Sequence, residues 1–114
     1  MAAKKDVTQL LERLEAFEDR LGVRLESLSA QLDADDDESM YLDVRGELHP
    51  KSGTELKQDM RLIVAVYDSA SRVVATEGWS FSTSDFWGFE VFHICVKLDV
   101  KDVTRVRIYP KPTQ

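Results

Sequence analysis

The amino-acid sequence predicts a mainly β protein, an antiparallel β-sandwich of five to seven strands preceded by one long N-terminal α-helix. Residues 6–32 place apolar side chains three and four positions apart and contain no proline. Residues 40–114 instead alternate apolar and polar side chains between short turns, which is the period of a strand. An acidic stretch separates the two patterns. We therefore expect an oligomerisation helix in residues 1–32, an acidic linker in 33–39 and a β-sandwich domain in 40–114.

Composition and charge limit the classes of function. The chain has 114 residues, a net charge of −6 and one cysteine, which excludes a disulfide framework within one chain. Residues 1–39 hold five basic and eleven acidic side chains, whereas residues 40–114 are neutral. This balance argues against binding to nucleic acid or to a membrane surface. No apolar signal core follows Lys4 and Lys5, so we expect a cytoplasmic protein.

The helix is predicted to begin at Asp6, whose carboxylate caps the first turn together with Gln9. Its apolar side chains occupy most a and d positions of four heptads, as in a coiled coil. They are Val7, Leu10, Leu14, Phe17, Leu21 and Leu28. We expect this stripe to join copies of the chain, the alternatives being packing against the chain's own β domain or against a foreign helix. Gly22 would cost the helix about 1 kcal/mol.

The acidic linker raises the question of calcium. Asp33, Asp35 and Asp37 match the first three ligand positions of an EF-hand loop. However, Glu38 replaces the required glycine and Val44 replaces the bidentate glutamate. We therefore interpret this segment as a solvated linker.

The β domain is expected to contain a strand from Met40, a hairpin of 60–67 with 72–76, a strand over 89–98 and a last strand over 103–109. A small open barrel is the alternative to the sandwich. The hairpin reads Val-Ala-Val-Tyr-Asp at 64–68 and Arg-Val-Val-Ala-Thr at 72–76. It resembles the strand-turn-strand of FxLYD-like and related immunoglobulin-like bacterial domains. The resemblance implies an immunoglobulin-like sandwich that acts as a binding or structural accessory domain, and it implies no functional residue.

Two groups of side chains were considered for chemistry. His93 and Cys95 share one face of a strand, as a Cys–His nucleophile requires, but the sequence shows no group to orient the histidine. A basic set could face phosphates, with Tyr109 for stacking, yet the domain carries no net positive charge. This set comprises Lys97, Lys101, Arg105 and Arg107. We expect no catalytic residue, no metal and no cofactor.

The aromatic segment 78–89 holds both tryptophans. Trp79, Phe81 and Phe89 fall at strand positions and are expected in the core. Phe86 and Trp87 follow a turn and precede Gly88, so they are the candidate partner-binding residues. The alternative is that they plug the open end of the sandwich.

Together these patterns predict a non-enzymatic protein-interaction module that gains avidity by oligomerising through its helix. The second hypothesis is a structural or assembly subunit of a larger bacterial complex, and a small enzyme comes third. The expected partners are a second copy of the chain and another protein.

Overall fold

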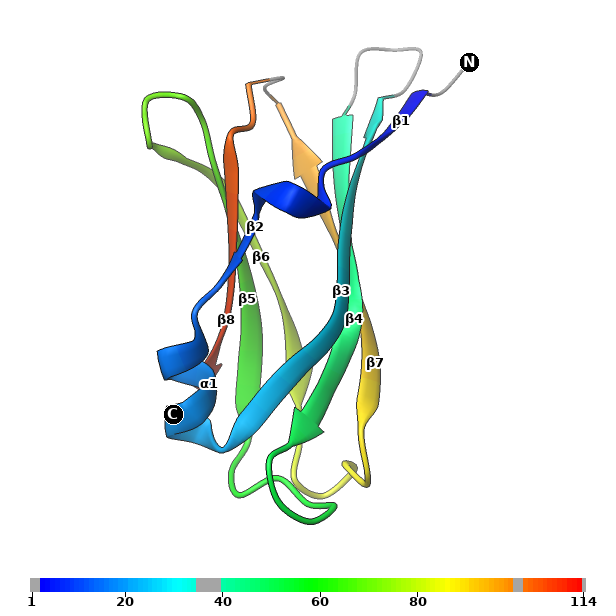
Figure 1. Cartoon of the computed structure of the whole chain (residues 1–114), viewed down its shortest axis with the longest axis vertical. Helices are drawn as coiled ribbons and strands as arrows, with labels where there is room; N and C mark the ends of the chain where they lie inside the picture. The colour runs from blue at the N-terminus through cyan, green and yellow to red at the C-terminus, as the bar shows by residue number, and fades with distance from the viewer. Residues whose placement is uncertain (1–2, 35–39, 100–101, 114) are drawn as a thin grey trace.

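The computed structural model describes residues 3–34, 40–99 and 102–113, which form a sandwich of two four-stranded sheets (Figure 1). Sheet A has the strand order β1-β3-β4-β7 and sheet B has the order β2-β8-β5-β6. The strands are β1 Ala3–Asp6, β2 Leu11–Arg13, β3 Val23–Ala34, β4 Met40–Pro50, β5 Met60–Tyr67, β6 Val73–Phe81, β7 Glu90–Leu98 and β8 Arg105–Pro112. The structure agrees with the predicted mainly β sandwich, but its described residues form eight strands instead of five to seven, three of them lie before residue 40, and the β2–β8 pair is parallel.

The predicted long N-terminal helix is wrong. Residues 3–34 contain β1, a 3-10 turn at Thr8–Leu10, β2, the seven-residue helix α1 at Glu15–Leu21, and then β3. β1 pairs with β3 in sheet A, whereas β2 runs parallel to β8 in sheet B. The segment therefore crosses from one sheet to the other and closes that side of the sandwich (Figure 1). Because the described residues contain no long helix, they offer no coiled-coil stripe, and the predicted oligomerisation through such a helix loses its basis.

A β-bulge explains why β3 resembled a heptad repeat. Leu25 and Ala30 both point into the core, and between them Ser27 and Leu28 together oppose the single residue Gly46 of β4. The inserted residue makes the step from Leu25 to Leu28 three residues instead of two. Leu21, which belongs to α1, precedes Leu25 by four, so leucines of two different elements fall at steps of four and three. A 3-10 turn, a short helix and a strand with one bulge thus together gave the spacing that predicted a single helix.

Two glycines are required by this local geometry. Gly22 has φ 70° and ends α1 in the left-handed conformation, where we had counted it as a cost to a longer helix. Gly46 lies under the bulge, where an added Cβ would come within 2.6 Å of Leu28 and 2.8 Å of Phe92. Ser27, on the bulge, has φ 56°, which is uncommon for a residue other than glycine.

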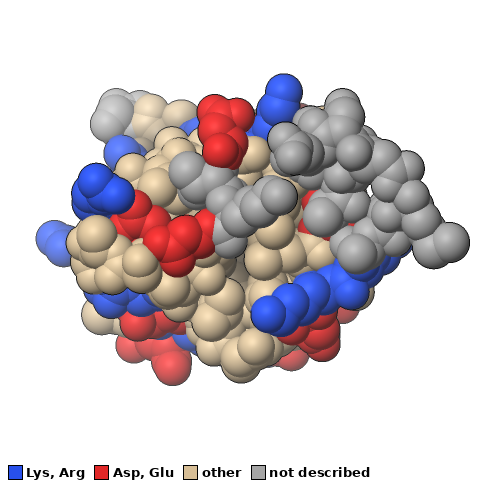
Figure 2. Space-filling view, turned by 90° about the horizontal axis from the view of Figure 1, so that it is seen from above, with Lys and Arg blue, Asp and Glu red and all other residues tan. Residues whose placement is uncertain are grey.

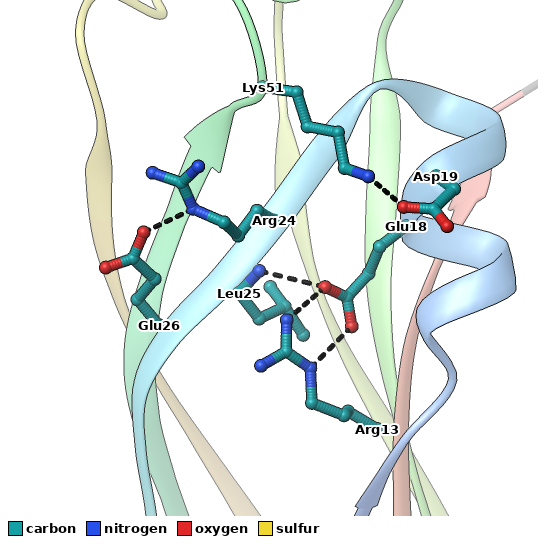
Figure 3. A network of polar contacts seen from close by, with 7 residues as sticks. All are labelled: Arg13, Glu18, Asp19, Arg24, Leu25, Glu26 and Lys51. Carbon is teal, nitrogen blue, oxygen red and sulfur yellow. Dashed lines mark hydrogen bonds and ion pairs between the residues drawn. The ribbon is translucent and has the colours of Figure 1, made fainter.

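α1 is fixed to the sandwich by a buried carboxylate (Figure 3). Glu18 is 2% exposed and accepts hydrogen bonds from Arg13 Nε at 3.1 Å, from Arg13 Nη2 at 2.5 Å and from the Leu25 backbone N–H at 3.1 Å. The same contact raises the pKa of Arg13. On the outer side of the helix, Lys51 pairs with Asp19. A buried charge is tolerated here because each of its oxygens is paired.

The core lies between the sheets and includes the N-terminal residues. Inward-facing side chains of β3, β4, β5, β7 and β8 fill it, and Phe92 is the largest one fully buried. Val7 and Leu21 belong to the same core cluster. The N-terminal segment is consequently part of the sandwich, and the boundary expected at residues 33–39 falls partly in β3, which includes Asp33. Residues 35–39 of that linker, with Asp35 and Asp37, lie outside the described residues.

The strand order differs from that of constant-type immunoglobulin domains. Those domains place strands A, B, E and D in one sheet and C, F and G in the other. In this chain β3 and β4 form a hairpin within sheet A, and β5 and β6 form a hairpin within sheet B. The chain therefore shares the layered architecture but arranges its hairpins differently.

Candidate functional site

Exposed apolar side chains gather where the chain enters β7. Trp87 is 76% exposed, Phe89 49% and Val91 65%, and they occupy every second position from the loop into the strand. We call these three residues the apolar patch. Because successive side chains of a strand point to opposite faces, Val91 lies on the outer face of sheet A. The β4–β5 and β6–β7 loops lie together at this end of the sandwich (Figure 1).

The two residues predicted to bind a partner are separated by the fold. Phe86 is 4% exposed and meets the Phe81 ring edge-on at 6.2 Å, so it closes this end of the core. Trp87 points to solvent. The sequence left two alternatives for Phe86 and Trp87, burial at the end of the sandwich or exposure to a partner. The structure shows the first for Phe86 and the second for Trp87.

Backbone and ring contacts hold the patch in place. Gly88, at φ 80°, donates its N–H to the Thr54 carbonyl at 2.8 Å, which ties the β6–β7 loop to the β4–β5 loop. Phe89 stacks on His49 of β4 with 4.9 Å between ring centroids and 6° between planes. The exposed rings are therefore preorganised, which reduces the entropy lost on binding.

The sequence could have shown part of this patch. β7 is alternately exposed and buried, with Phe92, Ile94, Val96 and Leu98 inside. That alternation places Val91 and Phe89 on the face of His93 and Cys95, but we had expected Phe89 in the core. Trp79, also expected there, is 37% exposed, while Phe81 is buried as predicted.

His93 and Cys95 do have a third group beside them. His93 Nε2 lies 3.0 Å from Asp43 Oδ1, and Asp43 is the cross-strand partner of Cys95. However, partial burial and the Asp43 carboxylate raise the pKa of Cys95, which disfavours the thiolate. A nucleophilic cysteine needs a lowered pKa. The arrangement is therefore an acid–histidine pair beside an unactivated thiol.

The basic residues of the last strand are engaged within the molecule. Arg105 and Arg107 lie over the ring of Tyr67, at 4.8 and 5.2 Å from its centroid. Arg107 also pairs with Glu12 of β2 at 2.7 Å, and this contact, followed by that with Tyr67, raises the pKa of Arg107. Lys97 lies on the other sheet, and Lys101 lies outside the described residues. The structure does not unite this set into one phosphate-binding surface.

Described side chains of both charges occur at the upper end of the molecule in Figure 1, opposite the apolar patch. Figure 2 shows Lys and Arg side chains interspersed with Asp and Glu around a view from above. Among the described side chains in this view, both signs of charge are present side by side, and a mixed surface of this kind does not steer a polyanion.

The six residues predicted for self-association are dispersed. Val7 and Leu21 are buried, Leu10 and Leu28 are half-buried against the core, and Leu14 is half-buried. Phe17 is 45% exposed and meets Tyr109 edge-on at 5.5 Å. It borders an apolar hollow of about 260 Å³ between α1 and the end of β8. The six do not form a shared stripe, because the helix that would align them is absent from the described residues.

One further cluster was missed by the sequence. Glu26 of β3 and Glu47 and His49 of β4 lie together on the outer face of sheet A. They form the one group in the described part of the chain whose ligand atoms are close enough to hold a metal ion. The segment His49-Pro50-Lys51-Ser52-Gly53 has the composition of a turn, which hides the place of His49 in β4 beside Glu47 and opposite β3.

Comparison with known proteins gives no relative. No protein-family model, curated protein or solved structure matches the chain. Among the described helices, none has the length and apolar character needed to cross a membrane.

Proposed function

We propose that the chain is a non-enzymatic protein-binding module whose contact surface is the apolar patch. The observation that carries this proposal is the exposure of Trp87 at 76%, beside Phe89 and Val91. Tryptophan is among the side chains most enriched at energetically dominant interface positions. An exposed cluster of large apolar side chains is typical of a surface that a partner covers.

The surroundings of the patch support a preformed site. The Gly88–Thr54 hydrogen bond and the Phe89–His49 stack fix the two loops without covering Trp87. Phe86, immediately before it, anchors the same loop in the core. The loop thus presents one aromatic side chain to solvent while its neighbour holds the backbone.

The type of partner follows from the neighbouring strand. β7 is an edge of sheet A, paired with β4 in the described residues. An edge strand offers backbone groups to an extended peptide, and side-chain pockets beside it supply specificity. We infer that the module binds an extended, apolar segment of another protein along β7, with Trp87 packing on its side chains.

A structural or assembly subunit is the second candidate, because β6 is also an edge strand. β6 ends sheet B as β7 ends sheet A, and its Val73 is 55% exposed. Copies joined edge to edge would form a continuous sheet. Such assembly would depend on β6 and β7 backbones and not on Trp87.

The experiment that tests the proposal is quantitative capture from a lysate of the cells that make the protein. Immobilised full-length chain is compared with Trp87→Ala and with Val73→Ala, an exposed apolar control on β6. We expect the same saturable partner with wild type and Val73→Ala, and at least a tenfold loss with Trp87→Ala, the loss that about 1.4 kcal/mol causes.

A fluorescence measurement then places the contact. In Trp79→Phe, Trp87 is the one remaining tryptophan of the sequence. Adding the captured partner should shift its emission to the blue and protect it from iodide quenching. Equal capture by Trp87→Ala, or an unchanged emission, would contradict the proposal. Concentration-dependent self-assembly that survives Trp87→Ala would support the assembly subunit instead.

A further inference from the structure

A carboxylate–imidazole cluster lies on the outer face of β3 and β4. One oxygen of Glu26, one oxygen of Glu47 and a ring nitrogen of His49 all lie within 4.8 Å of one another. His49 Nε2 is 2.9 Å from Glu47 Oε1. All three residues are half-buried. These are three donor atoms converging on a volume that one ion would occupy.

The pairing of the two strands makes this cluster electrostatically unbalanced. Glu26 and Glu47 are direct cross-strand partners, and like charges in this position destabilise a sheet. Arg24, the cross-strand partner of His49, donates through Nε to Glu26 (Figure 3). With a neutral imidazole, the four side chains carry a net charge of −1. The cluster therefore attracts a further cation.

The donors are positioned by rigid elements. All three belong to paired strands, and Phe89 stacks flat on the His49 ring at 4.9 Å. Glu26 belongs to the paired run Val23–Glu26 of β3, which ends immediately before the bulge. Sites on strands hold their ligands more precisely than sites on loops.

We propose that Glu26, Glu47 and His49 bind a divalent first-row transition-metal ion, with Zn²⁺ as its best representative. Each glutamate supplies one oxygen and the neutral imidazole supplies a nitrogen, so three protein ligands leave one tetrahedral position for water. Imidazole favours Zn²⁺ and related ions over Ca²⁺ and Mg²⁺, which prefer all-oxygen sites. Arg24, whose side chain is 50% exposed, turns toward solvent when the ion neutralises Glu26.

The proposal is tested by titrating Zn²⁺ into the full chain with isothermal calorimetry. Wild type is compared with Glu47→Gln, which keeps the shape and removes the charge, and with His49→Asn. Changes to groups that only orient a metal ligand weaken binding about 10- to 100-fold. Loss of a ligand itself should therefore weaken Zn²⁺ binding by at least about 100-fold. Far-UV circular dichroism establishes that each variant is folded.

The same sheet face offers a matched control. Asp43, His93 and Cys95 provide a second histidine, a carboxylate and a thiol away from the proposed site. The double variant His93→Asn, Cys95→Ser should bind one Zn²⁺ as tightly as wild type. Loss of binding in this double variant would assign the ion to Asp43, His93 and Cys95 and overturn the proposal.

Arg24→Ala separates a metal site from a set of ion pairs. Removing the competing guanidinium should tighten Zn²⁺ binding several-fold if Glu26 is a ligand, whereas unchanged or weaker binding contradicts that role. Wild type that takes up no Zn²⁺ overturns the proposal whatever the variants do. The result is independent of partner capture through Trp87, so either proposal can fail alone.

Discussion

The two lateral sides of the sandwich are built differently. On one side the segment from β1 to β3 crosses between the sheets, buries Val7 and Leu21 in the core and encloses the Glu18 carboxylate. On the other side the edge strands β6 and β7 lie next to each other, with Val73 and Val91 exposed. We call these the closed side and the open side.

This difference separates the part of the molecule that stabilises the fold from the part whose surface is free to bind a partner. On the closed side Val7 and Leu21 are buried in the core, and the buried charge of Glu18 is fully paired. On the open side β6 and β7 each have one paired neighbour strand among the described residues, and the apolar patch faces solvent. Substitutions on the closed side should therefore reduce stability, whereas those on the exposed surface of the open side should reduce binding.

The largest effect is expected from removing the closed side altogether. A fragment of residues 40–114 lacks β1, β2, α1 and β3, which leaves β4 and β7 alone in sheet A. Two strands cannot cover the core, so we expect no cooperative thermal unfolding and poor dispersion of amide proton shifts in an NMR spectrum. A folded fragment with a sharp transition would show that the closed side is dispensable and that 40–114 is an independent domain.

The next prediction contrasts neighbours in the loop that leads to the open side. Phe86→Ala should lower the free energy of unfolding by about 3–5 kcal/mol, because it empties a buried ring position. Trp87→Ala should change it by less than about 0.5 kcal/mol, as for other exposed positions. Urea unfolding of both variants measures the difference. Similar losses for the two would mean that Trp87 packs in the fold and is not free for a partner.

A smaller loss is expected at the buried charge of the closed side. Glu18→Ala leaves the Leu25 N–H without its acceptor and Arg13 without its partner, which should cost about 2–3 kcal/mol. Asp19→Ala, the adjacent control, removes an exposed pair with Lys51 worth at most about 1 kcal/mol. Equal losses in chemical denaturation would show that α1 is held by its surface and not by the buried carboxylate.

The smallest effect concerns acid and the turn before β6. Backbone and side-chain hydrogen bonds from Arg72, with one from Ala70, hold the pKa of Asp68 below its usual value. A lowered pKa in the folded state contributes stability above the unfolded pKa of about 3.9, and this contribution disappears as the pH falls through the folded pKa.

The melting temperature of Asp68→Asn should accordingly lie below that of wild type at neutral pH, and the gap should close in strong acid. Thermal melts at both pH values measure it. A gap that persists unchanged in acid would assign the effect to hydrogen-bond geometry and not to charge.

The sequence predicted the second half of the fold well. Residues 60–67 were predicted as a strand because they are apolar on both faces apart from Arg61, and 89–98 because apolar and polar side chains alternate. Both match β5 and β7 closely. The same alternation predicts which face of β7 is exposed to solvent and which face is buried. Where a strand contains no bulge, its pattern of apolar side chains was sufficient to predict it.

Residues 6–32 were wrongly predicted to be one helix because the spacing of apolar residues along the sequence does not show which strands pair. The bulge opposite Gly46 shifts the phase of β3 by one residue, and short elements at 8–21 supply further spacings of three and four. The one-residue shift in register becomes visible only when β3 is paired with β4, where Ser27 and Leu28 lie opposite Gly46.

The candidate sites divide in the same way. Trp87 could be predicted from the sequence because it lies in a loop, between the turn-forming residues 82–85 and Gly88, where an aromatic side chain is not held in a strand. Glu26, Glu47 and His49 were not found, because they become neighbours only through the pairing of β3 with β4. A site assembled across a hairpin depends on the register, which a single sequence does not specify.

The pairing of β2 with β8 has a consequence for synthesis. Glu12 and Arg107 are separated by 95 positions, yet they form an ion pair across two adjacent parallel strands. On the ribosome, residues 11–13 cannot pair with β8 until the 95 positions that separate Glu12 from Arg107 have been synthesised. During that interval the leucines of the opening segment are uncovered, so translation is the period in which the nascent chain is most exposed to aggregation and most in need of a chaperone.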